Sequence, residues 1–322
     1  MSRPPALVTR PLGGEIMAFL AVRCDVEVPD EDRAMPREEL LERVAGKHGV
    51  LAMLTDRIDD ETLDAAGPSL RVVANHAVGY DNVDVAACTR RGVVVTNTPD
   101  VLTDATADMT WGLILAASRR IAEGDRLVRS GSPWEWSPGF MLGREVTGKM
   151  LGVVGFGRIG QSVARRAVGF SMRVLAHTRT PPEDREDVEL VGFDDLLAES
   201  DVCSIHLPLS DETRHRFGAR ELALMKETAV LVNTSRGPIV DEAALATALA
   251  SGEIAGAGLD VYDREPEVHP ALLALENVVL APHLGSATVE TRAAMGMLAA
   301  RNLVAVLSGE RPPTPVNPEA LG

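Results

Sequence analysis

The sequence predicts an α/β protein of two domains, each with a doubly wound, mostly parallel β-sheet. Short apolar runs alternate with segments of helical period along most of the 322 residues. Strands that alternate with helices are joined by right-handed crossovers into parallel sheets. The alternation stops at a segment rich in Trp, Pro and Gly, residues 132–149, and then begins again. At roughly 150 residues per domain, the length also favours two domains.

The first series of elements occupies the first hundred residues, and glycines end its predicted helices. Expected strands are residues 6–11, 24–28, 49–55, 70–79 and 92–97, and expected helices are residues 38–49, 59–67 and 82–92. One long helix is then expected over residues 103–131. Thr103 or Asp104 is a suitable N-cap for it, and Gly131 is a suitable stop.

The second series begins at Met150 and contains more strands. Expected strands are residues 150–157, 172–178, 202–208, 229–235, 254–262 and 277–283, and expected helices are residues 158–170, 193–200, 219–226 and 241–252. A last helix over residues 288–309 is expected to return to the first half, which otherwise lacks a closing element. The predicted domains are therefore residues 1–100 with 287–322, which we expect to bind substrate, and residues 101–286, which we expect to bind a dinucleotide.

Charge and composition limit the partners. The chain carries 47 acidic and 32 basic residues, a net charge of −15, which repels nucleic acids and anionic lipids. We expect neither as a partner, and a site for a small anion needs its own positive charge. No apolar run approaches the ~20 residues that span a bilayer. The chain has three cysteines, Cys24, Cys88 and Cys203, which are far apart in the sequence and lack metal-ligand spacing. We therefore expect no metal site and a reducing cytoplasmic location.

A glycine-rich motif opens the second series. "LGVVGFGRIG" contains G-x-G-x-x-G at Gly155, Gly157 and Gly160, after a buried-strand run and before an amphipathic helix, the context of a Rossmann dinucleotide-binding turn. The first glycine permits the tight turn, the second lets backbone approach a pyrophosphate, and the third allows close packing of helix on strand. The helix N-terminus favours the anion. The expected phosphate-binding residues are Gly155, Phe156, Gly157, Arg158, Ile159 and Gly160.

The next strand bears on the choice of dinucleotide. An NAD site usually places Asp or Glu about twenty residues after the glycines, where it binds the ribose 2′-hydroxyl. Here the strand ends in His177, Thr178, Arg179 and Thr180, and the first acid is Glu183. Arg179 is suited to pair with a 2′-phosphate, and the two threonines can donate hydrogen bonds to it. We therefore expect NADPH to be preferred, with NADH possible.

Charged residues follow three successive strands of the second series. Arg236 lies past the first of them, Asp260 and Glu265 past the next, and His283 past the last. Because ligands bind at the carboxyl ends of the strands in an open α/β sheet, these side chains are expected to converge there. A histidine near its ordinary titration range suits proton transfer.

These motifs make the sequence resemble the D-isomer-specific 2-hydroxyacid dehydrogenases, closest to the glyoxylate/hydroxypyruvate reductases. The resemblance covers nearly the whole chain. It is carried by "AVGYDNVD", "DATADMTWGLILAASRRI", "GKMLGVVGFGRIGQSVARRAVGF", "LVNTSRGPIVDEAAL", "GAGLDVYDREP" and "LAPHLGSAT". It implies a flavodoxin-like substrate domain beside the Rossmann domain, an NAD(P)-dependent enzyme and a homodimer.

The resemblance also implies roles for single residues. The residue matching Arg236 binds the carboxylate and carbonyl of a 2-oxo acid, and its planar fork suits both oxygens. The residue matching His283 donates a proton as hydride reaches the carbon. The residue matching Glu265 pairs with the imidazole, favours its protonated form and fixes the ring. Asp260 is implied to accept a hydrogen bond from the nicotinamide carboxamide. The implied cofactor-lining residues are Leu207, Thr234, Ser235, Asp260 and Gly285.

Substrate contacts are expected from the first domain as well. The resemblance places the backbone amides of Val78 and Gly79 on the substrate carboxylate, and Gly79 gives access because it has no side chain. Leu54 and Val78 are expected to bound the pocket. Trp134 and Trp136 are ambiguous between packing or dimer contacts and substrate contacts, although Trp136 matches a loop that can cover a partner's site.

Two alternatives remain open. The substrate could belong to another D-2-hydroxyacid dehydrogenase, of the D-lactate or D-3-phosphoglycerate type. The chain could also be a dinucleotide-sensing, corepressor-like binding protein that keeps the fold without turnover. The Arg236, Glu265 and His283 set weighs against the second alternative, although such proteins can keep these residues, and so does the lack of an acidic or low-complexity segment for a partner.

Overall fold

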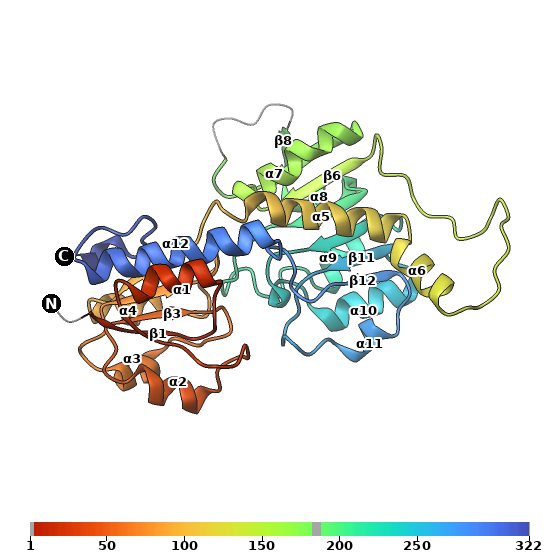
Figure 1. The fold of residues 1–322 in the computed structure, drawn as a ribbon. Helices are drawn as coiled ribbons and strands as arrows, with labels where there is room; N and C mark the ends of the chain where they lie inside the picture. Colours follow the sequence, from red (N-terminus) through yellow and green to blue (C-terminus); the bar gives the residue numbers. More distant parts are fainter. Residues whose placement is uncertain (1–2, 182–187, 322) are drawn as a thin grey trace. The chain divides into compact units, whose positions relative to one another are not determined.

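The computed structural model of the chain describes residues 3–181 and 188–321. It divides into two compact units, shown in Figure 1. Unit 1 comprises Met1–Leu102 and Thr288–Gly322, and unit 2 comprises Thr103–Ala287. Each unit contains a parallel β-sheet with helices on both faces, which confirms the predicted fold class.

Unit 1 is a five-stranded sheet in the order β2-β1-β3-β4-β5, which is the flavodoxin-like order. Its strands are β1 (Pro5–Val8), β2 (Asp25–Glu27), β3 (Gly49–Ala52), β4 (Val72–Asn75) and β5 (Val94–Thr96). Its helices are α1 (Gly14–Ala21), α2 (Arg37–Val44), α3 (Asp60–Ala66), α4 (Val85–Arg90) and α12 (Val289–Leu307), with the short 3₁₀ helix η3 (Pro318–Leu321).

The two faces of this sheet are buried by different helices. Leu7 of β1 packs with α2, α3 and α4, whereas its neighbours Ala6 and Val8 pack with α1 and α12, because successive residues of a strand point to opposite faces. Gly49 allows α12 to come close, since a Cβ there would lie 2.7 Å from the Leu303 side chain. The C-terminal helix is therefore part of unit 1.

Unit 2 is a seven-stranded parallel sheet in the order β12-β11-β10-β9-β6-β7-β8. Its strands are β6 (Met150–Val154), β7 (Arg173–His177), β8 (Val188–Leu190), β9 (Val202–Ile205), β10 (Val230–Asn233), β11 (Gly256–Leu259) and β12 (Val278–Leu280). Its helices are α5 (Thr103–Ser118), α6 (Ile121–Arg129), α7 (Arg158–Ala167), α8 (Phe193–Glu199), α9 (Ala219–Leu224), α10 (Glu242–Ser251) and α11 (Pro270–Leu273), with 3₁₀ turns η1 (Val168–Phe170) and η2 (Gly237–Ile239). Strand order reverses at β6, which makes the end of β6 the ligand-binding switch point.

The single long helix expected over residues 103–131 is wrong. The structure has two helices, α5 and α6, and Arg120 between them has a left-handed backbone with φ of 54°. The carbonyl of Ser118 accepts a hydrogen bond from the Arg144 amide at 2.7 Å, and a Cβ at Gly143 would lie 2.7 Å from the same oxygen. The break therefore results from a chain segment distant in sequence. Helix α1, strand β8 and helix α11 were not predicted from the sequence.

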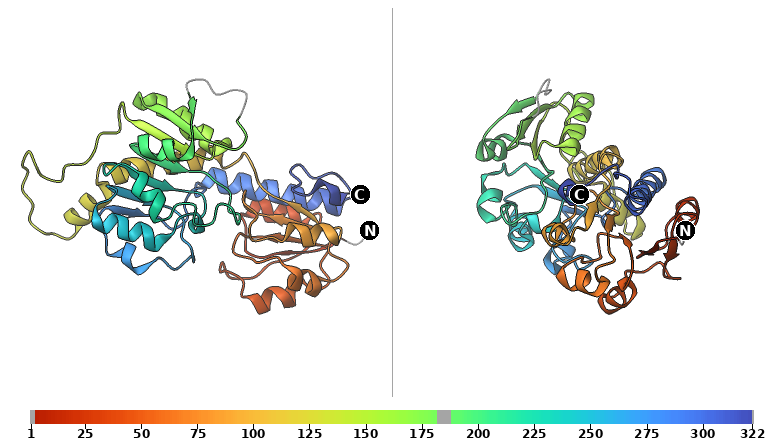
Figure 2. Two further views of the ribbon diagram at one scale, coloured as in Figure 1. Left: turned by 180° about the vertical axis from the view of Figure 1, so that it is seen from behind. Right: turned by 90° about the vertical axis from the view of Figure 1, so that its left-hand side faces the viewer.

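Between α6 and β6 the chain forms a long loop, residues 130–149, that extends away from the layers of unit 2 (Figure 2). Trp134 stacks on Phe140 within the loop, with ring centroids 6.0 Å apart. Trp136 and Leu142 are exposed by 75% and 68%. Among the described residues, no helix is long and apolar enough to cross a membrane.

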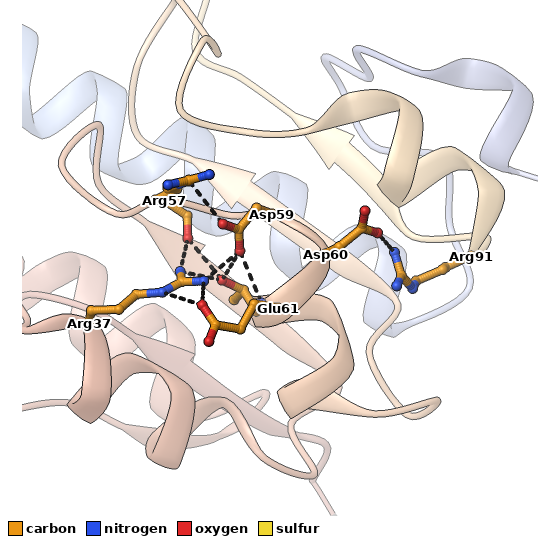
Figure 3. Close-up of polar contacts among 7 residues, drawn as sticks. Arg37, Arg57, Asp59, Asp60, Glu61 and Arg91 are labelled. Atoms are coloured by element: carbon orange, nitrogen blue, oxygen red, sulfur yellow. Dashed lines mark hydrogen bonds and ion pairs between the residues drawn. The ribbon is translucent and has the colours of Figure 1, made fainter.

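A polar cluster joins α2 to the start of α3 in unit 1 (Figure 3). Asp59 caps α3 by accepting a hydrogen bond from the Thr62 amide at 3.1 Å. The guanidinium of Arg37 donates to Asp59, to the Arg57 carbonyl at 2.7 Å and to the Thr62 hydroxyl at 2.7 Å. The guanidinium of Arg91, by contrast, donates to the carboxylates of Asp60 and Asp64.

Replacing Arg37 is therefore expected to cost more than replacing Arg91. Arg37→Ala removes one donor from the Arg57 carbonyl and one from the Asp59 carboxylate, which keep the Thr62 hydroxyl and the Thr62 amide as donors. We expect it to lower the free energy of unfolding by about 1 kcal/mol. Arg91→Ala removes only exposed ion pairs and should change it little. Urea unfolding followed by circular dichroism measures both, and equal losses would show that the backbone contacts of Arg37 are unimportant.

Candidate active site

The three predicted catalytic residues follow three neighbouring strands of unit 2. Asn233, at the end of β10, is paired in register with Leu259 of β11, and Leu259 is paired with Leu280 of β12. These strands therefore end at the same level of the sheet. The segments that carry Arg236, Glu265 and His283 leave from that common edge.

His283 and Glu265 form a direct pair at this edge. The imidazole Nδ1 lies 2.7 Å from Glu265 Oε2, and the two side chains are 26% and 29% exposed. The other carboxylate oxygen, Oε1, accepts a hydrogen bond from the Tyr262 amide at 3.0 Å. Burial raises the pKa of Glu265, but the hydrogen bond and charge of His283, the Tyr262 amide and the charge of Arg236 outweigh burial, so its pKa lies below the usual value. Glu265 is thus ionised at neutral pH.

His283 has a left-handed backbone, with φ of 55°. This conformation is unfavourable for residues with a side chain, and such strain is common at functional sites. The His283 amide donates to the Asp260 carbonyl at 2.8 Å. The Asp260 carboxylate accepts from the amides of Leu284 at 2.6 Å and Gly285 at 2.7 Å. Asp260 therefore holds the turn that presents the imidazole.

Arg236 lies close enough to Glu265 for its charge to lower the Glu265 pKa. Its backbone is held from two directions. The Asn233 side-chain amide donates to the Arg236 carbonyl at 2.9 Å. A Cβ at Gly237 would lie 1.8 Å from the Tyr262 carbonyl carbon, so only glycine lets the chain after Arg236 lie against the segment that carries Glu265.

The phosphate loop between β6 and α7 has the geometry that its sequence predicts. Gly155 has a φ of 93°, and a Cβ there would lie 2.4 Å from the His206 carbonyl oxygen. A Cβ at Gly160 would lie 2.2 Å from the Gly155 carbonyl oxygen. At Gly157, the N-cap of α7, nothing lies within 4 Å of an added Cβ. The open backbone at Gly157 and the start of a ten-residue helix fit the diphosphate of a dinucleotide.

The other residues of this loop that were predicted to bind phosphate differ in solvent exposure. Phe156 is buried in the core, and its carbonyl accepts from the Gln161 side chain at 3.1 Å. Arg158 is exposed and Ile159 is half-buried at the start of α7. Phe156 thus supports the loop through packing, while its backbone remains part of the turn.

The other predicted cofactor residues lie at the carboxyl ends of β7, β9, β10 and β12. Thr178, Arg179 and Thr180 follow β7, and Arg179 pairs with Glu212 at 2.8 Å on the exposed surface. The Thr234 hydroxyl is buried and lies 2.9 Å from that of Thr110 in α5. Leu207 packs on the core beside β9, Ser235 is half-buried, and Gly285 is buried.

The predicted substrate residues of the first domain lie in unit 1. Val78 and Gly79 follow β4, and Leu54 lies in the turn after β3. The side chain of Asn97 donates to the Val78 carbonyl at 2.8 Å, and that of Asn75 donates to the Gly79 carbonyl at 2.9 Å. Because the amide of a trans peptide points opposite to its carbonyl, Asn97 fixes the direction of the Gly79 N–H.

Two other histidines near strand ends differ from His283. The imidazole of His206 lies 2.8 Å from the Ser204 hydroxyl, and burial of the ring lowers its pKa to about 3. Burial, together with the charge of Arg292, lowers the pKa of His76 to about 4. Both are neutral at pH 7 and cannot supply a proton there. Within the residues that the structure describes, no three His, Cys, Asp or Glu side chains are grouped so as to hold a metal ion.

Sequence reasoning missed the asparagines that order these segments. Asn75, Asn97 and Asn233 each end or follow a buried strand, and their amides hold backbone of predicted site residues. A buried asparagine at the end of an apolar strand was a usable signal, because buried polar side chains need partners. Glu183, which was weighed in the choice of cofactor, lies outside the described residues.

Comparisons with known proteins agree with this geometry. Residues 111–285 match the model of the D-isomer specific 2-hydroxyacid dehydrogenase NAD binding domain. The chain is 51% identical to the glyoxylate reductase of Thermococcus gammatolerans, over 99% of this chain and 97% of that protein. It resembles the structure of TT0316 from Thermus thermophilus at 46% identity and a TM-score of 0.91, covering 97% of this chain and 99% of that one.

An NADPH-dependent glyoxylate/hydroxypyruvate reductase from Sinorhizobium meliloti, solved with NADP and malonate, is also similar. It is 36% identical with a TM-score of 0.86, covering 99% of this chain and 98% of that one. The chain therefore belongs to the D-isomer-specific 2-hydroxyacid dehydrogenase family and is an NAD(P)-dependent dehydrogenase.

Proposed function

We infer that the protein reduces small 2-oxo acids, glyoxylate and hydroxypyruvate among them, to 2-hydroxy acids, with NADPH as the preferred donor. One observation carries the inference: an imidazole paired with an ionised carboxylate and an arginine leave the same sheet edge as the dinucleotide loop. Relatives named as glyoxylate reductases, about half identical over nearly the full chain, support this substrate class.

Each site residue then has a defined task. A bound reduced nicotinamide supplies a hydride to the carbonyl carbon. Arg236 binds the carboxylate and carbonyl oxygens and polarises the carbonyl. His283 donates the proton from Nε2, because Nδ1 is directed to Glu265. Glu265 favours the protonated imidazole and fixes its ring. The amides of Val78 and Gly79 in unit 1 are proposed as further carboxylate ligands, with Leu54 bounding the pocket.

The cofactor assignments are part of the proposal. The loop Gly155–Gly160 would bind the diphosphate, with Thr178, Arg179 and Thr180 at the 2′-phosphate. Leu207, Thr234, Ser235, Asp260 and Gly285 would line the nicotinamide half. Asp260 accepts two backbone amides, and each of its oxygens retains a second lone pair for a carboxamide donor.

We also propose a homodimer formed through α6 and the loop at residues 130–149. Ile121 and Val128 of α6 are exposed by 56% and 64%, and Leu142 in the loop is exposed by 68%. Apolar side chains exposed together favour an interface, and twofold pairs are the commonest oligomers. Trp136 in this loop is proposed as a contact to the partner's site.

The activity itself is tested by mixing the protein with NADPH or NADH and a panel of 2-oxo acids. We expect oxidation of the reduced cofactor with glyoxylate and hydroxypyruvate, followed by absorbance. His283→Ala should lower kcat by about 10²–10⁴-fold, the usual contribution of proton transfer, with cofactor affinity retained. Turnover only with bulkier or phosphorylated acids would indicate a different dehydrogenase of the family. If none of the acids causes oxidation of NADPH or NADH, the protein is a binding protein.

Glu265→Gln tests the imidazole pair by its effect on pH dependence. The negative charge of Glu265 favours the protonated imidazole, so its removal should shift the alkaline limb of kcat/KM to lower pH. Gln retains an oxygen that can accept from Nδ1, so the ring should remain oriented. An unchanged limb would mean that His283 is not the group whose ionisation limits the reaction.

Arg179→Ala tests the preference for NADPH. Loss of a charge-assisted contact should weaken NADPH binding by about tenfold and leave NADH binding unchanged. Glu212→Gln should instead tighten NADPH binding several-fold, because Glu212 competes with a 2′-phosphate for Arg179. Arg173→Ala, at the other end of β7 and paired with Glu189, is the control. Equal effects of Arg179→Ala on both cofactors would contradict the proposed contact.

A further inference from the structure

Asn233 is the last residue of β10, and its buried side chain uses both of its polar atoms. The side chain is 1% exposed. Its oxygen accepts hydrogen bonds from the Ser235 amide at 3.0 Å and from the Ser235 hydroxyl at 2.7 Å. Its nitrogen donates to the Arg236 carbonyl at 2.9 Å. The backbone of Asn233 remains in the sheet, since its carbonyl accepts from the Asp260 amide at 3.0 Å.

These bonds join a rigid strand to the segment that turns away from it. The strand fixes Asn233, so three hydrogen bonds from one short side chain restrict the backbone dihedrals of Thr234, Ser235 and Arg236 together. A short side chain that hydrogen-bonds the backbone two or three residues on replaces part of a turn. The position of the Arg236 Cα, and hence the start of its side chain, depends on this restriction.

A second contact holds the same segment from the other side. The peptide after Arg236 lies against the Tyr262–Asp263 peptide, where a Cβ at Gly237 would overlap. The Tyr262 amide donates to Glu265, and the Asp263 amide donates to Glu242 of α10 at 2.8 Å. Arg236 and Glu265 are thereby held relative to each other, and the bond from Asn233 is the one that reaches Arg236 from its own strand.

We propose that Asn233 is a positioning residue, whose side-chain amide holds the Arg236 backbone so that the guanidinium meets the 2-oxo acid. The proposal rests on the proposed function, in which Arg236 binds that acid. It assigns the effect to the single hydrogen bond from Asn233 Nδ2 to the Arg236 carbonyl. The two hydrogen bonds from Ser235 to the Asn233 side-chain oxygen can be preserved while the bond from Asn233 Nδ2 to the Arg236 carbonyl is removed.

Asn233→Asp removes that one bond. A carboxylate still accepts from the Ser235 amide and hydroxyl, but it cannot donate, and it places an oxygen where the Arg236 carbonyl needs a donor. A matched control is Asn277→Asp in the same unit. The Asn277 amide donates to the carbonyls of Leu249 and Ala255 at 3.1 and 3.4 Å, before β12 and away from the site. Both variants make the same chemical change in a side chain that holds backbone.

Five quantities separate positioning from stability. They are KM and kcat for glyoxylate with saturating NADPH, the dissociation constant of oxalate by calorimetry, the dissociation constant of NADPH, and Tm. We expect Asn233→Asp to raise KM and the oxalate constant by about tenfold, the effect of weakening one hydrogen bond between the guanidinium and the charged acid. NADPH binding should stay within about twofold. Asn277→Asp should lower Tm by about as much as Asn233→Asp does. It should leave KM and oxalate binding unchanged.

A double substitution shows whether Asn233 acts through Arg236. If Asn233 affects substrate binding only through Arg236, the effects of the two substitutions on the binding free energy do not add. In an Arg236→Ala background, Asn233→Asp should therefore change KM and oxalate binding by less than about twofold. Additive effects would overturn the proposal. So would an Asn233→Asp variant that loses Tm like Asn277→Asp and keeps its KM and oxalate affinity.

The failure of the proposed function gives a different result. If Arg236→Ala alone leaves KM and oxalate binding unchanged, Arg236 does not bind the acid, and the function assigned to it is wrong. If Arg236→Ala weakens both and Asn233→Asp does not, only the role of Asn233 is wrong. Asn233→Ser is the second variant, because a hydroxyl can still accept from the Ser235 amide. If neither variant folds, Asn233 is a structural residue and the proposal is overturned.

Discussion

The register of three parallel strands is the constraint on which the site depends. Asn233, Leu259 and Leu280 are paired in register across β10, β11 and β12. The segments that follow these three residues therefore leave the sheet at the same edge. Three, six and three residues later the chain reaches Arg236, Glu265 and His283. A shift of one residue in any of these strands would send its inward side chains to the other face of the sheet. The buried apolar residues on both faces of unit 2 exclude such a shift.

The level strand ends alone do not fix the side chains, and buried polar groups provide the rest. Asp260 binds the amides after His283, and Asn233 binds the carbonyl of Arg236. Burial raises the pKa of Asp260 although the two amides oppose it, which shows that a carboxylate held here is costly. A left-handed histidine adds a cost of roughly 1–3 kcal/mol. Both costs are offset by the packed sheet of unit 2.

The sequence predicted the fold class and most strands because each strand is a short apolar run between glycines and polar residues. The phosphate loop was predictable for the same reason, since Gly155 and Gly160 are required by contacts that their spacing already implies. The break between α5 and α6 was not predictable, because it depends on Gly143 and Arg144 reaching back to Ser118. The pair between Arg179 and Glu212 was missed likewise, because the two residues come from different strand ends.

Charge explains why the site needs this arrangement. The whole chain is strongly negative and repels a small anionic acid at long range. Glu265 adds one more negative charge beside the proposed site, yet two groups that can be positive, Arg236 and His283, both lower its pKa. In the proposed function, the ionised carboxylate favours positive charge on the imidazole while Arg236 would supply the attraction for the acid. A neutral residue in place of Glu265 would leave the arginine and a charged imidazole to repel each other. The carboxylate thus makes anion binding and proton donation compatible at one strand edge.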